Sequence, residues 1–184
     1  MLHDGRVSVE HLRLKDNHTW RSKPGYAICV LDRGAVRFDF PKHWVMDQNE
    51  GAVMLHDRKP SIESCDLGVS IFRVPAEALH EVTLDELLLA SLKGEQAERE
   101  CSEIHHIERG DVQISWLEQR YIEETQKKPA KFRIALARGC VHVLITMNYW
   151  AKRAPALEPV WSEVLRTLVL GVYVKDPTAG PVIQ

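Results

Sequence analysis

Hydrophobic and polar positions form their clearest pattern between residues 26 and 44. Residues 26–31 are apolar at every position, which is typical of a strand covered on both faces, so we expect this strand at the centre of a sheet. The turn that follows ends in Gly34, where a short hairpin loop requires a positive φ angle. Residues 36–40 then alternate, and their polar series, which includes Asp39, is expected to face solvent.

The pattern continues with three more elements in the first half. Pro41 has no backbone N–H group and is expected to end the second strand, with Trp44 just beyond it at the edge of the core. Residues 52–56 and 65–74 predict two further strands. A Thr-x-x-Glu capping box at residues 83–86 predicts the start of a helix, because each side chain can accept the other residue's backbone N–H.

The second half of the chain predicts an antiparallel meander followed by a helix. That helix is expected to begin near Pro159, since proline suits the first helical turn, and to carry Trp161 on its apolar face. The strands of the meander are expected at residues 102–108, 112–123, 131–137 and 140–149.

The order of strands, helix, strands and helix predicts the fold class. It indicates one α+β domain over residues 26–174, in which helices pack on a mainly antiparallel sheet of about six or more strands. Residues 1–25 are expected to form an N-terminal extension, and residues 175–184, with two prolines, a flexible tail.

Charge and length exclude several classes of protein. The 184-residue chain has 24 basic and 26 acidic residues and a net charge of -2, so no strong field is available to attract nucleic acid. Apolar runs such as Leu87–Ala90 fall far short of the ~20 residues that span a bilayer. The first residues lack the basic start and apolar centre of a secretory signal. The sequence therefore predicts a cytoplasmic protein with no membrane span.

The four cysteines, at positions 29, 65, 101 and 140, never occur as a CxxC pair. This spacing argues against a zinc site or a thioredoxin-like motif. Without an export signal, buried or idle thiols are favoured over two disulfides. Neither a metal nor another cofactor is expected.

Three features together carry a family resemblance. An early hairpin ends in FPKHW at residues 40–44, a central helix precedes a long meander, and the closing helix contains PVWSEVL at residues 159–165. Over about residues 26–171 the chain resembles the Mog1/PsbP-like superfamily, including its bacterial DcrB-like branch. It differs from several members in lacking an export signal or lipoprotein cysteine and in having about 25 additional N-terminal residues.

The resemblance implies an antiparallel sheet sandwiched between helices. Members of this superfamily serve mostly as non-enzymatic binding modules, such as a cofactor of a nuclear-transport GTPase, an extrinsic photosystem subunit, or a bacterial accessory or chaperone protein. Their partner-contacting positions do not align with this chain, so the resemblance implies the fold alone.

Two groups of residues could carry chemistry. His105 and His106 are adjacent, so on a strand they point to opposite faces and would need Glu103 or His56 to complete a metal site; one half-buried and one solvated imidazole is the favoured interpretation. Cys140 and His142 share a strand face, where an imidazole can activate a thiol. Two residues along a strand span ~6.6 Å, however, which favours packing over catalysis.

Recognised nucleophile and phosphate-binding motifs are absent from the sequence. There is no GxSxG elbow, P-loop or GxGxxG, and the Gly68-Val69-Ser70 segment lacks the closing glycine of the elbow. An enzyme is therefore not favoured.

The end of the meander offers the candidate binding site. Tyr149, Trp150 and Arg153 could form an exposed aromatic and basic rim, and such side chains are enriched in interface hot spots. The other tryptophans in apolar surroundings, at positions 44, 116 and 161, are expected in or beside the core.

The sequence thus favours a non-enzymatic domain that binds a protein partner through one sheet face or the loops at its end. Two alternatives remain: a small thiol-dependent hydrolase that uses Cys140 and His142, and a carrier of a small apolar ligand between sheet and helix. A homodimer is left open.

Overall fold

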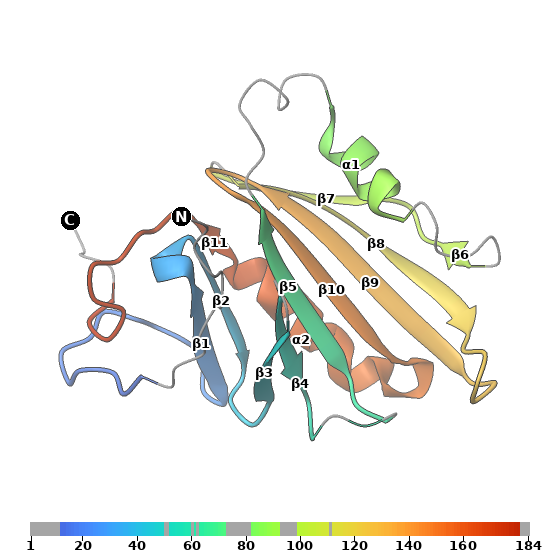
Figure 1. The fold of residues 1–184 in the computed structure, drawn as a ribbon, viewed down its shortest axis with the longest axis horizontal. Helices are drawn as coiled ribbons and strands as arrows, with labels where there is room; N and C mark the ends of the chain where they lie inside the picture. The colour runs from blue at the N-terminus through green and yellow to red at the C-terminus, as the bar shows by residue number, and fades with distance from the viewer. Residues whose placement is uncertain are drawn as a thin grey trace, which may run out of the picture.

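The computed structural model describes residues 12–49, 52–59, 61, 63–72, 82–92, 99–110 and 112–180. In this part of the chain, two antiparallel sheets pack with two α-helices, which confirms the α+β fold class (Figure 1). The large sheet contains eight strands: β3 (Val45–Asn49), β4 (Ala52–His56), β5 (Asp66–Phe72), β6 (Glu100–Cys101), β7 (His105–Arg109), β8 (Val112–Ile122), β9 (Pro129–Arg138) and β10 (His142–Trp150). The small sheet contains β1 (Tyr26–Leu31), β2 (Val36–Pro41) and β11 (Val169–Leu170). The helices are α1 (Leu84–Ser91) and α2 (Ala154–Thr167), with 3-10 turns η1 (Asp32–Gly34) and η3 (Ala151–Arg153).

The hairpin predicted from residues 26–41 is present as β1 and β2. Its loop bends as expected, because Gly34 has a φ of 95° and Arg33 also has a positive φ of 54°. The expected central position of the first strand is wrong: among the described strands, β1 pairs only with β2 and forms the edge of the small sheet. Its apolar run is only half-buried, so a doubly apolar pattern here did not indicate a central strand.

The expectation that Asp39 faces solvent is also wrong, since this residue is 2% exposed. Its carboxylate lies 2.6 Å from Nη2 of Arg37, and its backbone N–H donates to Oγ1 of Thr167 at the end of α2 (2.9 Å). Burial raises the pKa of Asp39 above its ordinary value. Arg37 and Asp39 of β2 therefore lie against the end of α2, a neighbour that is distant in the sequence.

Several strand boundaries differ from the prediction. β3 was not predicted, and it pairs with β4 at the outer edge of the large sheet. The expected strand at residues 102–108 corresponds to β7, which begins at His105, and the short strand β6 before residue 102 was not predicted; both pair with β8. Trp44 lies beyond Pro41 and is buried, as predicted. The expected strand at 65–74 is confirmed as far as Phe72, while residues 73 and 74 lie outside the described residues.

Both helices have identifiable start signals, but the prediction placed only one of them correctly. The capping box starts α1, where Thr83 Oγ1 accepts from the Glu86 amide (3.2 Å) and Glu86 accepts from the Thr83 amide (2.8 Å). α2 begins at Ala154 instead of near residue 159, because Pro155 occupies its first turn and Pro159 lies inside the helix. Arg109 of β7 donates to three carbonyls at the end of α2, those of Leu165, Arg166 and Leu168.

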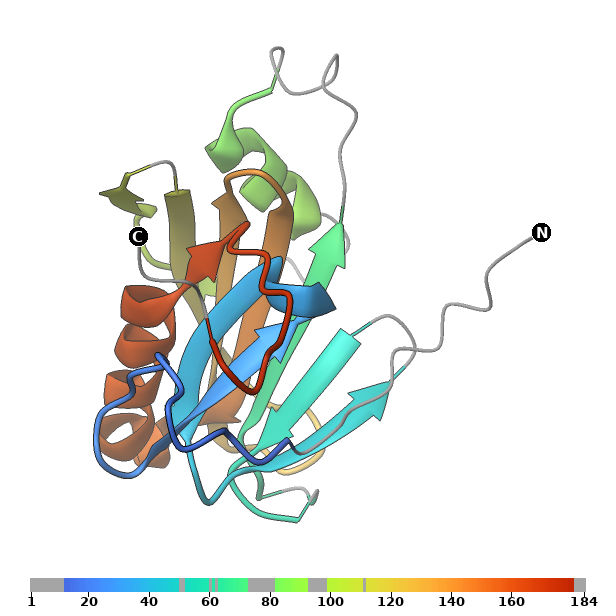
Figure 2. The same ribbon diagram turned by 90° about the vertical axis from the view of Figure 1, so that its left-hand side faces the viewer.

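The two helices cover opposite faces of the large sheet, as Figures 1 and 2 show. On one face, α2 and the small sheet enclose the main core, in which Phe38 and Trp161 pack against apolar side chains of β5 and β10. On the other face, Leu84 and Leu88 of α1 form a smaller cluster with residues of β8 and β9. Side chains alternate between the two faces along the central strands. In β9, Ala135 and Ala137 face the main core, whereas Ile134 and Leu136 face the smaller cluster.

The segments on either side of the domain contact each other. Residues 12–25 were predicted as part of an extension and residues 175–180 as part of a flexible tail, but backbone hydrogen bonds join Lys15 to Thr178 (3.0 Å) and Thr19 to Ala179 (2.8 Å). The indole N–H of Trp20 also donates to the carbonyl of Pro177 (2.7 Å), and Trp20 is buried. In the described residues, these two segments pack together on the domain.

Candidate functional site

The face of the large sheet that carries α1 is only half covered. α1 packs on β8 and β9, and no other described helix or strand covers β3, β4, β5 and most of β10 on this side (Figures 1 and 2). Sheet faces of globular proteins are normally buried against another layer, so a bare half-sheet is a candidate for binding.

Strand register identifies the side chains on this uncovered part. Opposite residues of β5 and β10 include Ser70 with Leu144 and Gly68 with Thr146, and these alternate with core residues such as Val69 and Ile145. We call this surface the open face; its residues are Met54, Gly68, Ser70, Phe72, Leu144, Thr146 and Asn148.

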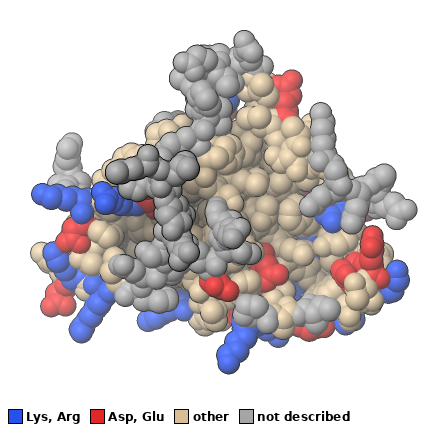
Figure 3. Space-filling model, viewed as in Figure 1, with Lys and Arg blue, Asp and Glu red and all other residues tan. Residues whose placement is uncertain are grey.

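The centre of the open face carries no charged side chain, while Asp47 and Asp66 lie on the same side of the sheet at its margin, opposite Met54 and Asn148. Figure 3 shows a hollow of uncharged surface there, with Lys, Arg, Asp and Glu side chains gathered around its margin. The side chains of Met54 and Thr146 pack closely against Gly68, because a Cβ at this position would lie 2.9 Å from Oγ1 of Thr146 and 3.1 Å from the sulfur of Met54. Phe72 and Leu144 form the border with the α1 cluster and are themselves partly buried.

A pocket of about 210 Å³ lies at the end of the open face where β5 begins and β10 ends. Tyr121 Oη donates to Oδ1 of Asn148 (2.9 Å) in its wall, and the Oδ1 atom of Asp66 lies 2.7 Å from Nδ1 of His56. We call it the end pocket; its lining residues are Ser61, Ser64, Asp66, Tyr121, Glu123, Ala130, Asn148, Tyr149 and Trp150.

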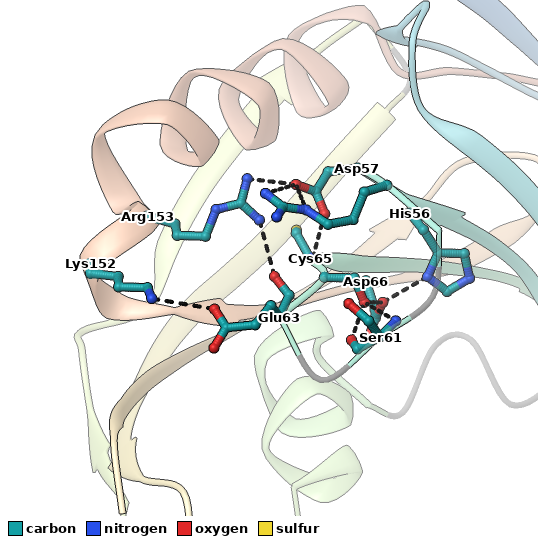
Figure 4. Close-up of polar contacts among 10 residues, drawn as sticks. His56, Asp57, Ser61, Glu63, Cys65, Asp66, Lys152 and Arg153 are labelled. Atoms are coloured by element: carbon teal, nitrogen blue, oxygen red, sulfur yellow. Dashed lines mark hydrogen bonds and ion pairs between the residues drawn. The ribbon is translucent and has the colours of Figure 1, made fainter. Parts of the chain in front are cut away.

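Arg153, one of the predicted binding residues, lies next to this pocket but binds another part of the chain. Its Nη2 atom lies 2.5 Å from Oδ2 of Asp57, and its Nη1 atom donates to the Glu63 carbonyl (3.4 Å), as Figure 4 shows. Burial pushes the pKa of Asp57 upward, but hydrogen bonds from Arg153 and from the Cys65 amide outweigh this effect and hold it below its ordinary value. Arg153 therefore ties η3 to the β4–β5 loop.

The two predicted aromatic anchors are buried. Tyr149 is 3% exposed and Trp150 is 6% exposed, so the expectation of an exposed aromatic rim is wrong. Alternation along β10 turns Tyr149 toward the core, where burial raises the pKa of its hydroxyl. Trp150 lines the end pocket, with Nζ of Lys128 5.6 Å from its ring centroid. Whether either residue contacts a partner stays a prediction.

The structure does not bring Cys140 and His142 together. Cys140 precedes β10 in a turn, and its sulfur contacts Gly171 beside the small sheet. His142 lies on the opposite face, where its ring centroid is 5.6 Å from that of Phe72. Burial lowers the pKa of His142, and the nearby Arg138 lowers it further. The expected shared strand face is wrong because the strand starts two residues later than predicted.

Two serine, aspartate and histidine clusters occur in the described residues, but neither has the order of a catalytic triad. Near the end pocket, Ser64 Oγ donates to Asp66 (3.0 Å), which also contacts His56. Under α1, Ser115 Oγ donates to Asp85 (2.6 Å), which contacts His106 (3.0 Å). In a triad the imidazole lies between serine and carboxylate and removes the serine proton. Here the carboxylate is central, so the imidazole does not contact the serine hydroxyl and cannot remove its proton directly.

The predicted metal candidates are also separated. His105 stacks on Trp116 with 4.3 Å between ring centroids, while His106 contacts Asp85 on the other face of β7. His56 lies in a different part of the sheet, against Asp66. Among the residues that the structure describes, no group of three or more His, Cys, Asp and Glu side chains could hold a metal ion.

The sequence reasoning missed the open face, although its signal was present. Leu67, Val69 and Ile71 face the main core, and the small residues Gly68 and Ser70 between them form the opposite face of the sheet. Small neutral residues between buried ones on two adjacent strands are the pattern that could have indicated it.

Comparison with known proteins gives the family. Residues 27–174 match the Alr1449 family, and the chain is 37% identical over 175 residues to the uncharacterized protein alr1449 of Nostoc sp. strain PCC 7120, with 93% of this chain and 91% of that protein aligned. The chain belongs to the Alr1449 family.

Several solved structures are similar in fold to this Alr1449 family member. Cyanobacterial PsbP (CyanoP) from Synechocystis sp. PCC 6803 has a TM-score of 0.56 at 13% identity, covering 82% of this chain and 95% of that one. LpqN of Mycobacterium tuberculosis, involved in cell envelope biogenesis, has a TM-score of 0.54 at 8% identity, covering 79% and 90%. PA94 from Pseudomonas aeruginosa, a putative regulator, has a TM-score of 0.52 at 13% identity, covering 79% and 97%.

These likenesses confirm the Mog1/PsbP-like fold predicted for the Alr1449 family member, and at such low identity they concern the fold alone. Assignment to the DcrB-like branch stays a prediction. None of the described helices has the length and apolar character needed to cross a bilayer.

Proposed function

We propose that this protein is a non-enzymatic accessory domain that binds a partner protein on the open face of its large sheet. The observation that carries the proposal is the half of the sheet beside α1, which no described helix or strand covers and whose centre carries no charge. An apolar segment of a partner would complete the layer that α1 begins, and removal of apolar surface from water drives most protein association.

The arrangement of polar groups supports binding over catalysis. The serines of both polar clusters donate to a carboxylate, and the two residues of the thiol alternative contact different sides of the sheet. The two pockets described, of about 210 and 360 Å³, lie at the ends of strands and not between the sheet and a helix, where the ligand of the carrier alternative was expected.

The experiment places a photo-cross-linking residue at position 70, in the middle of the open face, and another at position 173, whose tyrosine is exposed elsewhere. We expect position 70, and not 173, to capture one defined protein in cells. That protein is then purified, and its dissociation constant is measured with the wild-type chain and the Ser70→Arg variant. A buried unpaired charge costs several kcal/mol, so Ser70→Arg should weaken binding by more than about tenfold.

The matched control is Tyr173→Arg, which adds the same charge at an exposed apolar position away from the sheet. Equal affinity of the wild-type chain and the Ser70→Arg variant for the captured protein would contradict the proposal. Self-capture with concentration-dependent dimerisation would replace the partner with a second copy of the chain. The proposal keeps the cytoplasmic setting predicted from sequence, and cell fractionation tests it.

A further inference from the structure

We infer that the partner segment on the open face is apolar along its length and carries one lysine or arginine at the end that reaches the end pocket. This inference rests on the proposed function and adds the chemistry of the partner. Three features of the structure support it: the continuity of the two surfaces, the charge of the pocket and its aromatic wall.

The open face and the end pocket form one surface. Gly68 and Thr146 lie opposite each other on β5 and β10, and the next pair on the same face is Asp66 with Asn148. Two residues along a strand rise ~6.8 Å, about the length of a lysine side chain, so the apolar centre and the pocket are one side chain apart. A segment lying along β5 and β10 would therefore place a terminal cation in the pocket.

The charged residues that line the end pocket are both acidic, Asp66 and Glu123. The cations nearby are already paired with other carboxylates: Lys128 and Lys152 contact Glu63 at 3.4 and 3.3 Å, and Arg153 contacts Asp57. Hydrogen bonds from those two lysines hold the pKa of Glu63 below its ordinary value. The lining thus presents negative charge that a cation of the partner would complement.

Aromatic rings form part of the same wall. Trp150 and Tyr121 both line the end pocket. Each ring already lies close to a cation of the chain, with Lys128 Nζ 5.6 Å from the Trp150 centroid and Arg99 Cζ 4.3 Å from that of Tyr121. Aromatic faces attract cations, and these two contacts show that both rings of the wall accept an ammonium or guanidinium group.

The test uses hexylammonium as the probe, because it combines an apolar chain with the charge of a lysine side chain. Hexanol and hexanoate are the neutral and anionic comparators. Each is titrated into the ¹⁵N-labelled full-length chain, and amide and indole shifts are followed by NMR. We expect hexylammonium to bind about tenfold more tightly than hexanol, a difference of about 1.4 kcal/mol, and hexanoate most weakly. Its largest shifts should fall on Asp66, Asn148 and the Trp150 indole.

The double variant Asp66→Asn with Glu123→Gln removes both charges and should abolish the preference for hexylammonium. The amides of Thr125 and Gln126 donate to the two carboxylate oxygens of Glu123. Glu123→Gln alone keeps one of these acceptors, and should reduce the preference for hexylammonium. If the double variant unfolds, the single variant and the comparison of the three probes still test whether the pocket requires a cation.

Equal binding of all three probes on the open face would overturn the cation requirement and leave the proposed function standing. If no probe shifts any signal of the open face, both the cation requirement and the proposed function would be overturned. Shifts from hexylammonium that spread over exposed carboxylates elsewhere, with none in the pocket, would also overturn the inference.

Discussion

The two faces of the large sheet differ in how they are covered. On one face, α2 and the small sheet enclose a core that contains Trp161 at 1% exposure and Phe38. On the other face, α1 protects a cluster of five buried residues, and the sheet beyond it is bare in the described part of the chain. The same strands therefore supply folding energy through one set of alternating side chains and leave the other set for contact with a partner.

The largest expected effect is on the covered face. Trp161→Ala should lower the free energy of unfolding by about 3–5 kcal/mol, because it leaves a cavity where the indole packs against Trp116. Urea denaturation followed by circular dichroism measures the loss. Trp161→Phe retains a ring and should cost clearly less. A loss below about 1 kcal/mol for the alanine variant would show that this face is not the main source of stability.

The smaller cluster should give a smaller effect. Leu88→Ala should lower the free energy of unfolding by about 2–4 kcal/mol, because Leu88 is fully buried but α1 can shift toward the cavity. Leu89→Ala, in the same helix at 48% exposure, is the matched control and should change stability by less than about 0.5 kcal/mol. If the loss for Leu88→Ala equals that for Trp161→Ala, the two faces contribute alike and the comparison fails.

The ion pair between Arg153 and Asp57 should contribute less again. Arg153→Ala should cost about 1–3 kcal/mol at neutral pH, less than a fully buried pair, because Arg153 is partly exposed. Asp57 has a lowered pKa in the folded chain, so its contribution is present above the unfolded value of about 3.9 and is lost as the pH falls through the folded value.

The difference between Arg153→Ala and the wild-type chain should therefore shrink below about pH 4. Denaturation curves from pH 3 to 7 measure this trend. A difference that does not change with pH would mean that the loss comes from packing of the arginine side chain and not from its charge.

The smallest expected effect concerns the open face. Ser70→Arg should change the free energy of unfolding by less than about 0.5 kcal/mol, because its side chain points away from the core and can reach water. Thermal unfolding of the purified variant measures it. A loss above about 2 kcal/mol would indicate that another part of the chain covers Ser70, and the bare half of the sheet would then be a buried one.

Local sequence patterns predicted the structure well where residues close in the sequence determine the backbone conformation. Gly34 with its positive φ and the capping box at Thr83 and Glu86 are local devices, and both are confirmed. β3 was missed, because Val45-Met46-Asp47-Gln48-Asn49 has a single β-branched residue and forms a strand through pairing with β4.

Long-range partners explain most of what the sequence did not show. Asp39 is buried because Thr167, 128 residues away in the chain, reaches it. Arg153 is paired because Asp57 lies beneath it, and Trp150 is covered beside the pocket that residues of β5, β8 and β9 also line. The family resemblance predicted the fold. The open face depends on where α1 packs on the sheet, and no local sequence pattern predicts that position.

The pairing of residues 15–19 with residues 178–179 has a consequence for how the chain opens. These hydrogen bonds join positions about 160 residues apart, so they form only after both segments and the domain between them are in place. They have no part in the main core, and we expect the amide protons of Lys15 and Thr19 to exchange with solvent together, as one local unit, while those of β9 and β10 remain protected. The two segments would then behave as a clasp that can release without disturbing either face of the sheet.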